Sequence, residues 1–199
     1  DRGLIPAGSP VDLMLWVLTA AALVLCVLSK QPEQKTEKWM TALGMYFLAF
    51  GLLFSTRELH QGYRGLLTVI RALSLLSAIL LAVEGTLTFR GKALSWLWLP
   101  VCLTLIVRLV GAYQTWSREL QMMDYLFSLL GSLCLTGYAY HRAAKEAGAA
   151  EKPCWLFRLG LLAGFFCLTA GTGREPLPFY TVMACGVMLD VLSGEEAPC

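Results

Sequence analysis

Long apolar runs separated by short polar breaks organise this chain from end to end. A helix needs roughly 20 apolar residues to cross a bilayer, and most of the runs approach that length. The pattern therefore predicts an all-α fold: a single integral membrane domain, a polytopic bundle of about seven transmembrane helices. The predicted spans lie near residues 11–29, 39–55, 65–89, 94–113, 122–140, 154–170 and 179–192.

Two of these runs need further interpretation. Residues 11–29 lack a strongly basic lead and a small-residue cleavage site, so we interpret them as a span rather than a signal peptide. Residues 141–152 follow the fifth run and are rich in Ala, Lys and Glu. We expect this polar stretch to extend the fifth helix into water. The seventh run is the shortest and the weakest candidate to cross the bilayer fully.

The lysines give the predicted bundle a direction. All six fall in alternate polar breaks, which places them on one side of a membrane: Lys30, Lys35, Lys38, Lys92, Lys145 and Lys152. Cytoplasmic loops of membrane proteins retain Lys and Arg. We therefore predict the N-terminus outside and the C-terminus inside. Arginines occur in both sets of breaks, so the total bias is moderate.

Composition supports a membrane protein and narrows the possible partners. Of the 199 residues, 57% are hydrophobic and only 15% are charged, whereas about a quarter of a soluble domain is charged. The spans leave no room for a soluble catalytic domain. A net charge of +2 with no basic stripe does not favour nucleic acid as a partner. The expected partner is a lipid bilayer, the cell (plasma) membrane.

No motif for catalysis, a metal or a cofactor is present. The seven cysteines are spread singly, and the only histidines, His60 and His141, fall on opposite sides of the predicted membrane. There is no serine in a Gly-x-Ser-x-Gly elbow. We predict no catalytic residue, no metal site and no cofactor, and rank an intramembrane enzyme last among the functions considered.

Two arginines form an outer polar layer in the predicted bundle. Arg71 and Arg108 each lie about two turns from the outer end of their spans, too deep to face lipid without compensation. In one interpretation they line an outer-facing pocket with Asp124 and Glu58 and bind a small anionic or zwitterionic solute, since guanidinium forks suit carboxylates and phosphates. In the other, the four residues pair and join helices.

Two carboxylates form an inner layer. Glu84 and Asp190 fall in the inner thirds of the third and seventh spans. They are candidates for proton or cation coupling in a transport cycle, because ionisable groups at this depth are functional by default. The alternative is that they pair with Arg158, early in the sixth span, or reach the lipid headgroups.

Several short segments resemble a family of small multi-spanning bacterial membrane proteins without known activity. The segments are Leu4-Ile5-Pro6-Ala7-Gly8, Trp98-Leu99-Pro100, Met123-Asp124-Tyr125, Tyr140-His141-Arg142-Ala143 and Phe165-Phe166-Cys167-Leu168. The resemblance implies a bacterial cytoplasmic membrane and carries no information about chemistry.

Two functional hypotheses follow from these features. The first is an integral membrane protein that binds or transports a small anionic or zwitterionic solute. It depends on the outer arginines and the inner carboxylates. The alternative is a non-transporting seven-helix sensor or an assembly partner in a membrane complex, which would need a partner membrane protein to act through.

Overall fold

The structure is a computed structural model that describes residues 17, 19–21, 24, 38–58, 64–91, 95–116, 126–148, 153–171 and 178–193. These residues form helices and helix-terminal turns, with no strand among them. The prediction of an all-α fold is therefore confirmed for this part of the chain. The elements are α2 (Lys38–Glu58), α3 (Arg64–Phe89), the 3-10 helix η1 (Ser95–Leu97), α4 (Trp98–Trp116), α5 (Leu126–Glu146), α6 (Pro153–Gly171) and α7 (Pro178–Leu192).

Six of the predicted apolar runs coincide with helices α2 to α7. The predicted first run is described only at positions 17, 19–21 and 24, which are helical, and the rest of it lies outside the described residues. Helix α4 begins at Trp98 after η1, so Pro100 occupies its first turn. Proline suits that place because its fixed φ matches the helix and its missing N–H is not needed there. Helix α5 continues to Glu146, beyond the predicted span end at residue 140.

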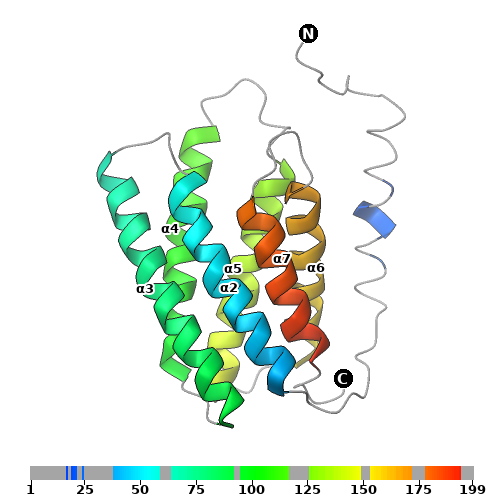
Figure 1. The fold of residues 1–199 in the computed structure, drawn as a ribbon. Coiled ribbons are helices and arrows are strands. Elements are labelled where there is room, and N and C mark those ends of the chain that lie inside the picture. Colours follow the sequence, from blue (N-terminus) through cyan, green and yellow to red (C-terminus); the bar gives the residue numbers. More distant parts are fainter. Residues whose placement is uncertain are drawn as a thin grey trace.

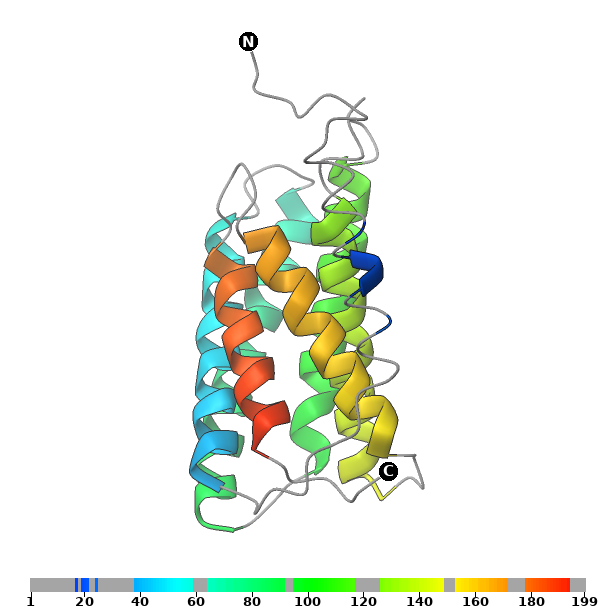
Figure 2. The same cartoon turned by 90° about the vertical axis from the view of Figure 1, so that its right-hand side faces the viewer.

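The six helices pack as a closed ring. Each of α2 to α6 packs against the next helix along the chain, and α7 packs against both α6 and α2. Successive helices run in opposite directions (Figure 1), and the view turned by 90° shows them side by side (Figure 2). Side chains that point inward from helices that are not neighbours can therefore meet inside the ring.

One end of the ring carries the described lysines, Lys38 at the start of α2 and Lys145 near the end of α5. We call it the lysine end. It holds the starts of α2, α4 and α6 and the ends of α3, α5 and α7 (Figure 1). The turn after α3 also lies there, with Gly91 close to the Lys38 amine and in the left-handed region at φ 73° that glycine adopts freely. This grouping agrees with the alternation of lysines along the chain.

Helices α2 and α7 approach each other most closely at two glycines. A Cβ on Gly44 would lie 2.8 Å from the carbonyl oxygen of Gly186, too close for any side chain. Gly160 and Gly164 in α6 similarly give space to Val191 and Met188 of α7. Small residues thus let the backbones approach, as in the close helix contacts common in membrane bundles.

Two of the described helices are long and apolar enough to cross a membrane. The stretches that qualify are Lys38–Ser55 in α2 and Leu66–Phe89 in α3. Shorter apolar stretches occupy Trp98–Gln114, Trp155–Gly171 and Pro178–Leu192.

Candidate functional site

A buried ion pair near the lysine end joins two helices that are not neighbours in the ring. Arg142 Nη1 of α5 lies 3.6 Å from Asp190 Oδ2 of α7. The Tyr138 hydroxyl, one turn before Arg142, donates a hydrogen bond to the same carboxylate oxygen. Arg142 and Asp190 are only 5% and 4% exposed. Since α6 lies between α5 and α7 along the ring, this contact crosses the interior of the bundle.

A second carboxyl group lies close to the same guanidinium, and a third lies near the second. Arg142 Nε donates to Glu146 Oε1 at 3.2 Å, and the Glu146 side chain is 10% exposed. Glu84 of α3 is 1% exposed and close enough to act electrostatically on Glu146. Helices α3, α5 and α7 therefore each contribute one carboxyl group to this part of the bundle. We call Glu84, Tyr138, Arg142, Glu146 and Asp190 the Arg142 cluster.

Aromatic and hydroxyl groups enclose the cluster. The Trp98 ring, 1% exposed, lies 6.0 Å from Arg142 Cζ and packs edge-on against Tyr138 at 6.3 Å. Ser193 donates to the Asp190 backbone oxygen at 2.5 Å and accepts from Thr41 of α2 at 2.7 Å. Within the described part of the chain, the buried atoms here that make no hydrogen bond include Asp190 Oδ1, Glu146 Oε2 and Trp98 Nε1.

The environment of Glu146 raises the pKa of its carboxyl group. Glu146 lies six residues past Tyr140, where the predicted fifth span ends. The pKa of its carboxyl is raised from 4.5 to about 7, chiefly by burial; Arg142 opposes the rise, and Glu84 and Asp190 add to it. Burial removes water that would stabilise the charged form, and like charges act in the same direction. Glu146 therefore changes its protonation state near neutral pH.

A second buried arginine lies toward the opposite end. Arg108 of α4 is 5% exposed and donates to the Ser55 hydroxyl of α2, with the Ser55 carbonyl 3.5 Å away. Its guanidinium lies 3.5 Å from the centre of the Phe179 ring and 5.8 Å from that of Tyr180, both at the start of α7. Tyr180 in turn bonds Ser132 of α5 at 2.9 Å. We call Ser55, Arg108, Phe179 and Tyr180 the Arg108 layer.

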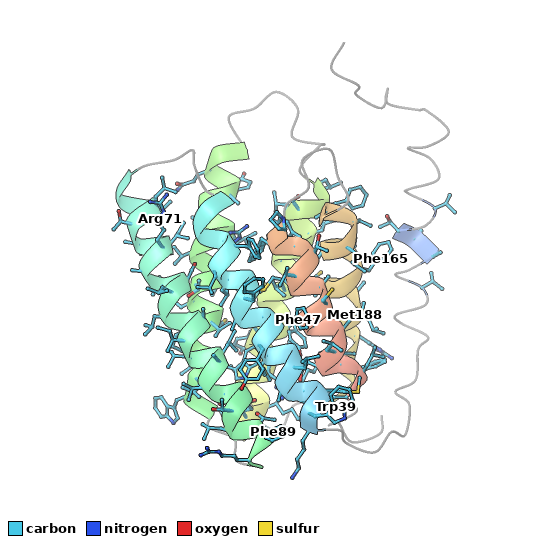
Figure 3. The ribbon with its side chains drawn as sticks, in the orientation of Figure 1. Trp39, Phe47, Arg71, Phe89, Phe165 and Met188 are labelled. Atoms are coloured by element: carbon cyan, nitrogen blue, oxygen red, sulfur yellow. The ribbon has the colours of Figure 1, made fainter. Side chains whose placement is uncertain are left out.

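The structure places the four predicted outer residues differently. Arg108 is buried inside the ring, whereas Arg71 is exposed on α3, near the end opposite Trp39 and Phe89 (Figure 3). The two guanidinium groups therefore do not share one interior site. Glu58 ends α2, but its side chain lies outside the described residues, as does all of Asp124. Among the predicted set, only Arg108 is described in a buried position.

The predicted inner residues lie in one half of the bundle. Glu84 and Asp190 are both buried near the lysine end. Asp190 pairs with Arg142, and not with Arg158 as one interpretation had it. Gly160 of α6 faces Tyr138 and Val191. Arg158, two residues earlier, is turned by about 200° around the helix, away from them.

The sequence interpretation missed Arg142 and Glu146 because residues 141–152 look like a solvated extension, and it gave no role to Tyr138 in the fifth span. The helical extension is confirmed as far as Glu146, but its expected exposure to water is wrong for Arg142 and Ala143, which are buried. The spacing of these residues in the sequence does indicate that they belong together. Tyr138, Arg142 and Glu146 recur every four residues, which puts them on one face of a helix. The buried face of α5 thus becomes polar toward the end of the helix.

Metals and known proteins give no further guidance. Among the described residues, no group of three or more His, Cys, Asp or Glu side chains could hold a metal ion. No protein-family model matches the chain, and comparison with curated proteins and with solved structures finds no similar protein. The resemblance to a bacterial membrane family stays a prediction.

Proposed function

We propose that the chain is a multi-pass integral membrane protein of the cell membrane, a bacterial cytoplasmic membrane, and that it binds a small anionic or zwitterionic solute at Arg108. In this arrangement the lysine end faces the cytoplasm and the Arg108 layer lies in the outer half. The single observation that carries the solute site is a buried guanidinium stacked against the Phe179 ring at the meeting point of α2, α4 and α7.

The exterior of the bundle supports the membrane setting. Large apolar side chains are exposed along the middle of α3 and α4, including Leu75, Ile79 and Val83 at 53%, 56% and 43%. Leu103 and Ile106 of α4 are 51% and 43% exposed. A helix that is apolar on both its buried and its exposed faces is typical of a span in lipid rather than of a surface helix in water.

Aromatic side chains at the lysine end support the same setting. Trp39, Phe89, Trp96, Tyr140 and Trp155 are between 54% and 77% exposed and come from the terminal turns of α2, α3, η1, α5 and α6 near that end. Exposed Trp and Tyr gather at the headgroup level of a bilayer, and Lys is retained on its cytoplasmic side. A belt of aromatics beside Lys38 and Lys145 fits a cytoplasmic interface.

Arg108 has the chemistry that an anionic group requires. Its planar N–H donors suit a carboxylate or phosphate. The Phe179 ring covers one flat face of the guanidinium, so an anion would bind at the edge, where the N–H groups lie. A ligand anion would replace Ser55 as hydrogen-bond acceptor at Nη1. Arg71 is not needed for this site. As an exposed residue two turns from the start of α3, it can extend its charge to the headgroups.

A pair of matched lysine variants tests the solute site. The purified protein in detergent micelles is screened for thermal stabilisation by inorganic phosphate, acetate, glycine and other small carboxylates and amino acids. A probe at 100 times its Kd stabilises the folded state by about 2.7 kcal/mol, a rise of a few degrees. Arg108→Lys keeps the charge but removes the two-pronged donor, so it should abolish that rise, while Arg71→Lys should retain it.

Other outcomes would count against the proposal. If no probe stabilises the wild-type protein, or if Arg108→Lys responds as the wild type does, Arg108 is a structural residue. A stable partner membrane protein that co-purifies with such an unresponsive chain would favour the alternative of a sensor or assembly partner.

A further inference from the structure

In the Arg142 cluster, two carboxyl groups share one guanidinium. Glu146 and Asp190 both contact Arg142, and all three side chains are at least nine-tenths buried. An uncompensated buried charge costs several kcal/mol. At least one carboxyl in the folded protein therefore favours its neutral form, which requires a proton taken from water.

We propose that the Arg142 cluster is a proton-binding site that exchanges with the lysine-end solution through Glu146 Oε2. The site is separate from the Arg108 layer and does not depend on a solute binding there. When it fills, one O–H bond forms at Glu146 and its negative charge is neutralised. The proton comes from a hydronium ion or a water molecule at the lysine end, whose O–H bond breaks and leaves water or hydroxide behind.

The geometry selects Glu146 and its Oε2 atom. Glu146 Oε1 already accepts from Arg142 Nε, whereas Oε2 makes no hydrogen bond among the described residues. Ala147 and Gly148, directly after Glu146, are exposed at the end of α5, so water reaches this side of the cluster first. Asp190, deeper in the bundle, already has both Tyr138 and Arg142 as partners of its Oδ2 atom.

A second observation points to a species not held by the protein alone. The Trp98 ring packs on Tyr138 beside Arg142, and its buried indole N–H has no acceptor. Buried polar atoms are nearly always paired, so unpaired ones gathered in one cluster mark a place for a proton and a bridging water. The described residues form no metal-binding group here, which favours a proton over a divalent cation.

The raised pKa of Glu146 agrees with this assignment. Burial is the main cause, and the charged groups that act on this pKa are Arg142 on α5, Glu84 on α3 and Asp190 on α7. Arg158 on α6 is turned away from Tyr138, by its position two residues before Gly160. Because the folded pKa of about 7 exceeds the ordinary 4.5, the folded state binds this proton more tightly. Its contribution to stability is full below pH 4.5 and is lost as the pH rises to about 7.

Infrared titration of the full chain in lipid nanodiscs tests the proposal. The carbonyl stretch of a protonated carboxyl is followed against pH. We expect a band in the wild type that disappears with a midpoint near pH 7 and is absent in Glu146→Gln. In Glu84→Gln the midpoint should move to lower pH, because a neighbouring negative charge is removed. Arg71→Gln, at the opposite end, should leave it in place.

Three results would overturn the proposal. One is a wild-type protein with no titrating band between pH 5 and 8, and another is a band that persists in Glu146→Gln. The third is a midpoint that stays unchanged in Glu84→Gln while the amide band shows an intact helical fold. If no solute probe stabilised the wild-type protein, the proposed solute site at Arg108 would fail but the proton site would not. The two proposals can therefore fail separately.

Discussion

Replacing Arg142 with methionine is expected to lower the free energy of unfolding by about 3–5 kcal/mol at pH 8. The substitution removes the only guanidinium within reach of Asp190 and Glu146 that the structure describes, while methionine fills much of the same volume. The loss comes from the carboxylates left behind. Asp190 keeps the Tyr138 hydrogen bond, but Glu146 loses its donor.

The same variant should be much less destabilised in acid. Arg142 lowers the pKa of Glu146, so its removal raises that pKa above the present value of about 7. A protonated carboxyl no longer needs the arginine. The difference between the variant and the wild type should therefore shrink as the pH falls from 8 to 5. Chemical unfolding in detergent micelles, followed by circular dichroism at both pH values, measures the difference.

Arg90→Met is the matched control, because Arg90 is exposed in the turn after α3 at the same end of the bundle. It should change stability by no more than about 0.5 kcal/mol. Adding Asp190→Asn to Arg142→Met should restore part of the loss, since it removes one carboxylate that the first change left without its cation. Equal effects of Arg142→Met and Arg90→Met would show that the cluster does not stabilise the fold.

Introducing an aspartate at Ile79 should cost about 2.5–3.5 kcal/mol of membrane insertion free energy. Ile79 lies past the middle of α3 and is 56% exposed. In a water-soluble bundle, a polar residue at such a position would change stability by no more than about 0.5 kcal/mol. The sign and size of this single effect therefore distinguish lipid from water as the solvent of this face.

Phe89→Asp is the control for Ile79→Asp. Phe89 is 68% exposed but ends α3 at the lysine end, where headgroups and water solvate a carboxylate. We expect a clearly smaller effect there. The measurement compares the membrane-inserted fractions of the two variants, made by the same cells, after extraction of peripheral proteins at high pH. Equal tolerance of both substitutions would argue that the exposed face of α3 is not in contact with lipid.

The hydrophobic pattern predicted the helices well because each apolar run maps onto one local element. Position along a helix also follows from the sequence, and Glu84 and Asp190 both lie toward the lysine end of their helices. The pattern could not predict rotation about the helix axis. Arg71 and Arg108 share a depth in the sequence interpretation, yet one is exposed and the other buried.

Arg142 shows a second reason why the sequence could not predict the whole site. A charged residue in a polar stretch is solvated in most proteins, and only tertiary packing reveals otherwise. Here α7 brings Asp190 against the end of α5, a contact between residues 48 positions apart in the chain. Nothing local encodes such a pairing. The four-residue spacing of Tyr138, Arg142 and Glu146 indicates a shared face but not what that face meets.

The central claim is that the ring of helices crosses a bilayer with its lysine end in the cytoplasm, and labelling from each side tests it most directly. Single cysteines replace Lys38, Lys145 or Tyr113, the last exposed near the opposite end of α4, in a chain otherwise free of cysteine. A membrane-impermeant maleimide should label Tyr113→Cys in intact cells, and Lys38→Cys and Lys145→Cys only in inverted vesicles. Labelling of Lys38→Cys and Tyr113→Cys from the same side, or recovery of the folded chain in buffer without detergent, would contradict the claim.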